Sequence, residues 1–224
     1  MKQLELYGDS ILKGVTYAAE QNKYRLCHRA RFDELEQQGI AVNNHSRMGA
    51  TVEKGVSILE KHAPYADDTL VILEYGGNDC DFDWAEVAEN PQGTFLPHTP
   101  EDAFVAKYRY AVETARERGA EVAMLSLIPI DAGKYFSWIT REKNGDNILQ
   151  WLGDVSMLSR WQEYYSRLVE DLAASLRCPL IDIRREFLLS HRFGDLLSAD
   201  GIHPTQAGHD LIADRIAAYT LAAG

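Results

Sequence analysis

A serine near the start of the chain stands in a setting that suits nucleophilic catalysis. Ser10 follows a short apolar run and lies in the segment Gly8-Asp9-Ser10-Ile11, with Gly14 shortly after it. An apolar run that passes into a small-residue turn is typical of a buried strand that presents a side chain at its carboxyl end. A serine hydroxyl is a weak nucleophile alone, and it needs a histidine base, an orienting carboxylate and donors for the oxyanion.

The segment Asp-Gly-Ile-His-Pro at residues 200–204 offers the base and the carboxylate together. A carboxylate three residues before an imidazole, with a glycine between them, can fold back so that Asp200 accepts the Nδ1 proton of His203. This bond fixes the tautomer and aims Nε2 at a serine hydroxyl. We therefore predict that Ser10, His203 and Asp200 act as nucleophile, base and orienting acid.

The elements that must position these residues alternate between strands and helices. Near-continuous apolar runs predict five strands. The first begins at Leu4, and the other four span residues 40–44, 69–75, 121–128 and 179–183. Helical spacing predicts helices at 31–38, from Thr51, and at 100–118, 155–177, 184–190 and 205–222. This alternation predicts a three-layer α/β/α sandwich around a five-stranded parallel sheet, with a flavodoxin-like topology and a single domain over residues 1–224. The candidate turns follow strand ends, where ligands bind in such sheets.

Three stretches lack a clear pattern. Residues 11–30 read as a loop with a helical turn, and residues 80–100 and 130–153 read as irregular connections rich in aromatic residues. The last two follow the third and fourth strands, so we expect them to border the pocket. Trp84 and Tyr135 are the candidates there for contact with an acyl or sugar group, and packing of these rings against the body of the protein is an equal alternative.

Composition narrows the class of protein. The net charge of −11 over 224 residues disfavours nucleic acid and anionic membrane surfaces as partners. The N-terminus lacks the apolar core of a signal peptide and no run is long enough to span a membrane, so a soluble, cytoplasmic protein is expected. Three cysteines without a Cys-x-x-Cys pair argue against disulfides and a thiolate zinc site. We expect neither a cofactor nor a metal.

Four short motifs, taken together, resemble those of the SGNH (GDSL-type) hydrolase family. They are Gly8-Asp9-Ser10-Ile11, Gly49 within residues 47–51, Gly76-Gly77-Asn78-Asp79, and the segment 200–204. They stand in the family's order and span nearly the whole chain, whereas the Gly-x-Ser-x-Gly elbow of common α/β-hydrolases is absent. Ile11 departs from the leucine that gives the family its name, which is a small change of apolar shape.

The resemblance implies roles for further residues. The oxyanion would be held by the backbone N–H groups of Ser10 and Gly49 and by the side-chain amide of Asn78, while Asp9 would mainly support the turn. Asp79 is a further candidate for substrate contact beside Trp84 and Tyr135. Gly49 would be glycine because the backbone must approach the substrate closely.

The expected activity is hydrolysis of carboxylic esters through an acyl-enzyme, with water as acceptor and short acyl chains favoured. A carbohydrate O-deacetylase and a thioesterase would use the same residues, so the expected partner is a small-molecule ester or an acetylated sugar. A binding module without turnover on the same scaffold is the alternative from another class.

Overall fold

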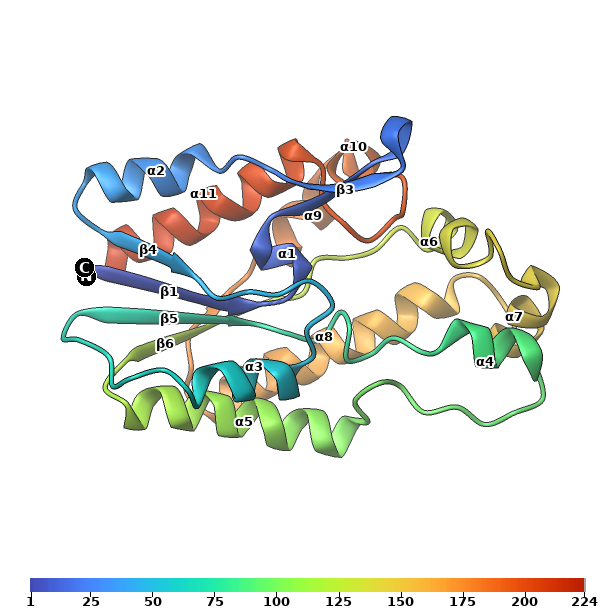
Figure 1. The fold of residues 1–224 in the computed structure, drawn as a ribbon, viewed down its shortest axis with the longest axis horizontal. Coiled ribbons are helices and arrows are strands. Elements are labelled where there is room, and N and C mark those ends of the chain that lie inside the picture. The colour runs from blue at the N-terminus through green and yellow to red at the C-terminus, as the bar shows by residue number, and fades with distance from the viewer. Residues whose placement is uncertain (224) are drawn as a thin grey trace.

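A five-stranded parallel sheet runs through the middle of the protein, which is described over residues 1–223 by a computed structural model (Figure 1). The strands lie in the order β4-β1-β5-β6-β7. Their bounds are β1 Gln3–Gly8, β4 Ala41–Asn44, β5 Thr69–Glu74, β6 Glu121–Leu125 and β7 Leu180–Ile181. The α/β class and the five parallel strands predicted from the alternation of elements are confirmed.

Helices cover both faces of the sheet, which explains why the strands read as unbroken apolar runs. All six residues of β5 are buried. Side chains of β1 alternate between the faces, with Leu4 and Leu6 in one apolar cluster and Tyr7 in the other. The first cluster is covered by α2 Ala30–Gln37, α9 Arg184–Leu189, α10 Phe193–Leu196 and α11 Gln206–Ala223. The second is covered by α3 Val52–Leu59, α5 Glu101–Glu117 and α8 Met157–Ser175.

The register of the central strands brings their carboxyl ends to one edge. Leu6 of β1 lies opposite both Asn44 of β4 and Ile72 of β5, and Gly8 lies opposite Glu74. The connections that leave these three strands therefore start side by side. They carry Ser10, Gly49 and Asn78, so the sheet gathers three distant motifs at one place.

Residues 11–30 form a β-hairpin, whereas the sequence predicts a loop with a helical turn. The segment contains α1 Ser10–Lys13, β2 Val15–Ala18, a 3₁₀ turn Ala19–Gln21 and β3 Lys23–Leu26, with β2 and β3 antiparallel. All four residues of β3 are exposed, so the strand leaves no apolar alternation in the sequence. Asn22 takes a left-handed conformation (φ 49°) at the tip, as turn asparagines often do.

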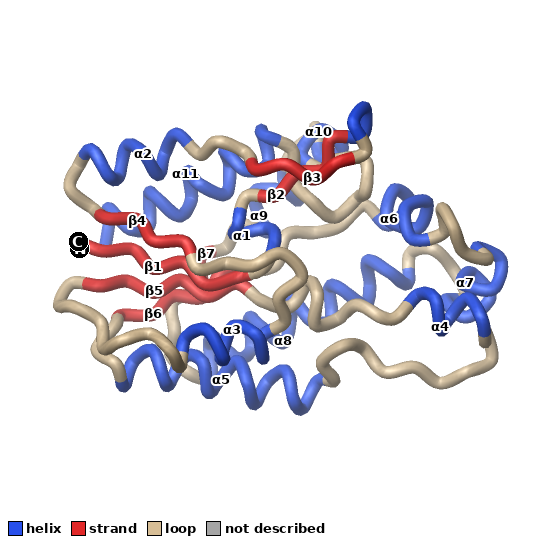
Figure 2. The backbone as a smooth tube through the Cα atoms, in the orientation of Figure 1, coloured by secondary structure: helices blue, strands red, loops and turns tan. Residues whose placement is uncertain are grey.

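Three short helices project beyond the sheet where the sequence shows only irregular connections (Figure 2). They are α4 Trp84–Glu89, α6 Ala132–Ile139 and α7 Gly145–Leu152. Their apolar side chains pack on one another in a third cluster, and each helix is too short to show a clear period. Asp83, Asp131 and Asn144 accept backbone N–H groups at their first turns, and these N-cap residues are the signal that would have located them.

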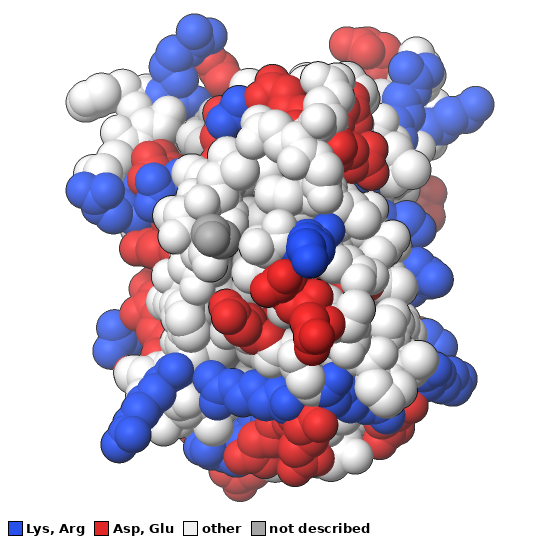
Figure 3. Space-filling model, turned by 90° about the vertical axis from the view of Figure 1, so that its left-hand side faces the viewer, with Lys and Arg blue, Asp and Glu red and all other residues white. Residues whose placement is uncertain are grey.

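The surface at the amino ends of the strands carries basic and acidic side chains interspersed (Figure 3). Among residues 1–223, no helix has the length and apolar character needed to cross a membrane.

Candidate active site

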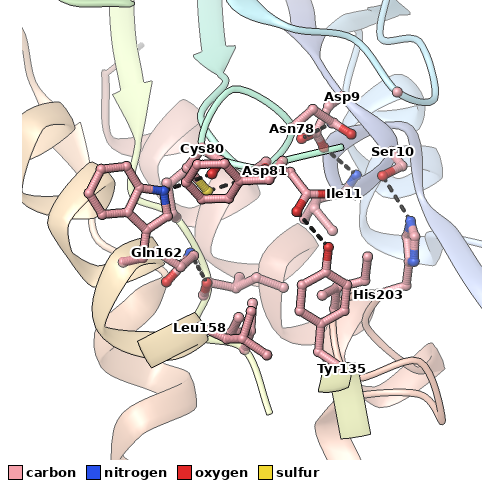
Figure 4. Close-up of a pocket in the computed structure, with 18 of the residues that line it drawn as sticks. Asp9, Ser10, Ile11, Asn78, Cys80, Asp81, Tyr135, Leu158, Gln162 and His203 are labelled. Carbon is pink, nitrogen blue, oxygen red and sulfur yellow. Dashed lines mark hydrogen bonds between the residues drawn. The ribbon is translucent and has the colours of Figure 1, made fainter. Parts of the chain in front are cut away.

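Ser10, His203 and Asp200 lie in one hydrogen-bonded series at the carboxyl edge of the sheet. Figure 4 shows the bond between Ser10 and His203. Ser10 begins α1 directly after β1, and the other two lie in the loop between α10 and α11. His203 Nε2 is 2.9 Å from Ser10 Oγ, and His203 Nδ1 is 2.6 Å from Asp200 Oδ2. All three side chains are buried. The structure thus brings together residues 193 positions apart in the chain.

The loop around Asp200 folds back as the sequence suggests. Asp200 Oδ1 accepts the backbone N–H groups of Ile202 and His203 at 3.2 and 3.1 Å, and the Ser198 hydroxyl at 3.1 Å. Gly201 has a φ of +78°, and a Cβ there would lie 2.5 Å from the backbone nitrogen of Tyr135, so glycine is required. Burial raises the pKa of Asp200, but hydrogen bonds and the charge of His203 outweigh it, and the pKa lies below its ordinary value.

Asp9 and Glu74 form a buried pair of carboxyl groups next to Ser10. Asp9 Oδ1 accepts the N–H of Ile11 at 2.7 Å and so caps α1, while the Asp9 N–H donates to Glu74 Oε2 at 3.2 Å. Burial raises the pKa of both groups, and the charge of Asp9 raises that of Glu74 further, well above its ordinary value. One proton is therefore held between the two side chains, with Glu74 as the protonated partner.

We expect Glu74→Gln to flatten the pH dependence of stability. The folded protein keeps Glu74 protonated above its ordinary pKa of 4.5, so it binds more protons than the unfolded chain. Wild-type stability then falls as pH rises through this window, by up to about 1.4 kcal/mol per pH unit. The amide introduced by Glu74→Gln can donate to Asp9 and accept its N–H without a proton to lose. The free energy of unfolding in urea, measured near about pH 5 and about pH 8, checks this.

Glu113→Gln is the matched control, because Glu113 is an exposed residue of α5. Its unfolding free energy should follow the wild-type pH dependence. Equal pH dependence in Glu74→Gln and wild type would contradict the shared proton.

The candidate oxyanion donors border the same pocket as Ser10. Gly49 has a φ of +71°, in the region that favours glycine, and among the described residues no atom beyond its chain neighbours lies within 4 Å of where its Cβ would be. The Asn78 amide donates to Asp9 Oδ2 at 2.8 Å and to the Ala50 carbonyl at 3.2 Å. Asn78 would therefore serve an oxyanion by giving up the longer bond to Ala50, and its role stays a prediction.

The three candidate substrate contacts have different positions. Trp84 and Tyr135 line the pocket, whereas Asp79 does not. Asp79 accepts the N–H of Val52 at 3.0 Å at the start of α3, and burial raises its pKa to about 6. Its position therefore indicates that it holds α3 to the turn after β5.

The pocket in front of Ser10 has a volume of about 490 Å³, within the usual range for small-molecule sites. Its wall is mainly apolar and is formed by side chains that include Phe82, Trp84, Tyr135, Leu152, Leu158 and Trp161. These come from the connections after β5 and β6 and from α8, so the two aromatic stretches of the sequence do border the pocket. Leu158 and Trp161 lie on α8, within the long helix predicted at 155–177, and the sequence did not mark them as pocket residues.

Several polar groups in this wall are hydrogen-bonded within the protein. Asp81 Oδ1 accepts both the Trp84 Nε1–H at 2.9 Å and the Tyr135 hydroxyl at 2.7 Å. The Trp161 Nε1–H donates to the Cys80 carbonyl at 2.8 Å. The aromatic rings therefore present their apolar faces to the pocket and keep their polar ends in the wall.

Sequence reasoning missed Tyr24, which packs edge-on against His203 with ring centroids 5.1 Å apart. Tyr24 lies on β3 of the unpredicted hairpin, so nothing in the sequence placed it beside the base. The hairpin thus covers one side of the imidazole.

Cys80 lies in the pocket wall but is unsuited to act as a nucleophile. Burial raises the pKa of its thiol well above the ordinary value, and Asp81 and Asp79 raise it further. Its Sγ donates to the Gly77 carbonyl at 3.3 Å.

Among the described residues, one group of three potential metal ligands lies together, and none of its members lines the pocket in front of Ser10. It consists of Glu5, His45 and His62.

Comparisons with known proteins agree with this architecture. The model of the GDSL-like lipase/acylhydrolase family matches residues 6–211. No curated protein matches the sequence. A lipase/acylhydrolase from Enterococcus faecalis has a similar structure, with 17% identity, a TM-score of 0.63, and coverage of 98% of this chain and 95% of that one.

Two acetylxylan esterases also have similar structures. A catalytic mutant of one from Geobacillus stearothermophilus has 19% identity and a TM-score of 0.67, covering 98% of this chain and 94% of that one. The acetyl xylan esterase AlAXEase has 20% identity and a TM-score of 0.63, covering 97% of this chain and 98% of that one. At these identities the likeness establishes the fold.

Proposed function

The chain belongs to the GDSL-like lipase/acylhydrolase family, and from that premise we propose that it hydrolyses carboxylic esters through an acyl-enzyme on Ser10. The observation that carries this proposal is the series of hydrogen bonds from Ser10 Oγ through His203 to Asp200, which opens on the pocket. In this proposal Ser10 Oγ attacks the acyl carbonyl while His203 Nε2 takes its proton and then delivers it to the leaving alcohol.

Deacylation repeats the proton movement with water as the nucleophile. His203 takes a proton from the water that attacks the acyl carbonyl, and it delivers this proton to Ser10 Oγ as the acid leaves. Ionised Asp200 holds the imidazole in one tautomer and stabilises its positive charge in both steps. The Gly49 N–H, the Ser10 N–H and the Asn78 amide are the proposed donors to the oxyanion, each contributing about 3 kcal/mol to the transition state.

The mainly apolar lining of the pocket favours a substrate with an apolar acyl group. A sugar ring needs polar partners for its hydroxyl groups, but Asp81 Oδ1 and the indole N–H groups of Trp84 and Trp161 already have partners within the wall. We therefore propose short to medium acyl chains, from butyryl to octanoyl, lying along the aromatic wall. This extends the preference for short chains expected from the sequence.

We expect kcat/KM on p-nitrophenyl esters to rise with acyl length from acetate to hexanoate. Burying one CH₂ contributes about 0.8 kcal/mol, which corresponds to about fourfold for each added carbon that enters the pocket. Leu158→Phe narrows the pocket and should move the optimum to a shorter chain. Leu149→Phe is the control, because Leu149 is exposed on α7 and should leave the optimum unchanged.

A carbohydrate O-deacetylase is the second candidate, favoured by the three Trp residues that line the pocket and by the acetylxylan esterases of similar fold. Acetate release from acetylated xylan, measured beside the ester series, separates the two. Faster turnover of the acetylated glycan than of any acyl ester would replace the first proposal with this one.

A further inference from the structure

Three side chains with metal-binding atoms converge beside β1, near the edge where it pairs with β4. Glu5 lies within β1, His45 directly follows β4, and His62 follows α3. Their ligand atoms all lie within 4.8 Å of one another. Glu5 is fully buried, while the two imidazoles are 27% and 26% exposed, so an ion has a path from solvent.

The Glu5 carboxylate has no permanent cation among its partners in residues 1–223. Its Oε1 accepts amide groups of Asn43 and Gln3, and its Oε2 faces the Nε2 atoms of His45 and His62. A buried carboxylate costs free energy unless a positive charge compensates it. Within residues 1–223 these partners include no lysine or arginine, whereas a divalent ion between the three side chains would supply a full positive charge.

The His62 ring is already oriented as a ligand. Its Nδ1–H donates to the Ala63 carbonyl at 2.8 Å, which leaves the Nε2 lone pair facing Glu5 Oε2 at 3.9 Å. Metal-bound histidines characteristically donate their other ring N–H in this way. The ring also stacks on Tyr65, with centroids 4.6 Å apart.

The His45 ring is held by Tyr7, which is hydrogen-bonded to the Tyr65 side chain that stacks on His62. His45 stacks on Tyr7 with centroids 4.6 Å apart, and the Tyr65 hydroxyl donates to the Tyr7 hydroxyl at 2.9 Å. Both imidazoles are therefore fixed by packing, so little ordering is needed when an ion binds.

We propose that Glu5, His45 and His62 bind a divalent transition-metal ion, with zinc as the preferred ion and water completing the coordination. Two imidazoles and one carboxylate favour zinc over magnesium or calcium. Bond lengths of about 2.0–2.1 Å require neighbouring ligand atoms roughly 3.3 Å apart. When an ion binds, the distance between the His62 and Glu5 ligand atoms would shorten slightly. The distance between the His45 and Glu5 ligand atoms would lengthen, because the ion replaces the proton between these two groups.

The candidate metal site lies beside the segment that leads from β4 into the Gly49 turn. The His45 N–H donates to the Leu6 carbonyl, and two residues later the Arg47 N–H donates to the Gly8 carbonyl, on the way to Gly49. The ion therefore stabilises the base of this turn and takes no part in a chemical step. Its effect should be seen in stability and binding, whatever the protein's activity.

Titration of the metal-free full chain with zinc chloride by calorimetry tests the proposal. One equivalent should bind with micromolar or tighter affinity, and the thermal midpoint should rise by roughly 5 °C at about a hundred times Kd. Cobalt(II) should give the visible absorption of a tetrahedral site, and magnesium should have no effect. His62→Phe keeps a ring to stack on Tyr65 but should weaken zinc binding at least about tenfold.

His28→Phe is the matched control, because His28 is an exposed histidine 3.2 Å from the Asp33 carboxylate. It should bind zinc like the wild type. Equal affinity in His62→Phe and wild type would place the metal elsewhere and overturn the proposal. So would the lack of binding at submillimolar zinc, which would leave Glu5 and His45 as a hydrogen-bonded pair.

Discussion

Ser10→Ala is expected to lower kcat for ester hydrolysis by at least about 10⁴-fold, which is the largest effect expected of any substitution in this chain. The Ser10 hydroxyl lies 2.9 Å from His203 Nε2, so the substitution removes the oxygen that is placed for attack beside the base. Alanine is a good helix former at the start of α1, and the fold should remain intact. The measurement is kcat on p-nitrophenyl hexanoate, with covalent labelling by a fluorophosphonate probe.

Ser166→Ala is the matched control. Ser166 is fully buried on α8 and its hydroxyl has no hydrogen-bond partner within residues 1–223. Replacing it with alanine should therefore change the free energy of unfolding little. This variant should be labelled and turn over like the wild type. Probe incorporation into folded Ser10→Ala, or activity above about 1% of wild type, would assign the nucleophile to another residue. No labelling of the folded wild-type protein would favour the binding module without turnover.

Much of the fold follows from the sequence because the strands are buried on both faces. β5 is apolar over nearly its whole length, and α5 and α8 keep a regular apolar period against the sheet. The hairpin differs because all four residues of β3 are exposed, so this strand has no apolar alternation. The short helices α4, α6 and α7 pack on one another, so their pattern depends on contacts that no single segment reveals.

The residues of the candidate site also fall into those that the sequence predicts and those that it does not. The positions of Ser10, Gly49 and Asn78 follow from strand ends that converge at one edge of the sheet, so short motifs predict them. His203 lies in the loop between α10 and α11, and its motif predicts its bond to Asp200. The contact of Tyr24 with His203 and the shared proton at Glu74 depend on tertiary packing. Glu74 reads in the sequence as the polar end of a strand, and only its burial beside Asp9 gives it an unusual pKa.

Asp200→Asn is expected to lower kcat by about 10³- to 10⁴-fold while leaving Ser10 in place. The backbone N–H groups of Ile202 and His203 need an acceptor at Oδ1, so the new amide oxygen should occupy that position. The amide NH₂ then faces His203 Nδ1, which in the wild type is 2.6 Å from a carboxylate oxygen, and donates to it. The ring proton moves to Nε2, which faces Ser10 as a donor and can no longer accept the hydroxyl proton.

A merely structural role for Asp200 predicts a different result, since it would reduce stability and activity together. The tautomer argument predicts that folded Asp200→Asn keeps its thermal midpoint within a few degrees while kcat collapses. It also predicts that the downfield proton resonance of the His203 Nδ1–H bond disappears. Asp195→Asn, at an exposed aspartate a few residues upstream, should change none of these. Wild-type kcat in folded Asp200→Asn would show that His203 acts without an orienting carboxylate, and the proposed proton path would then be wrong.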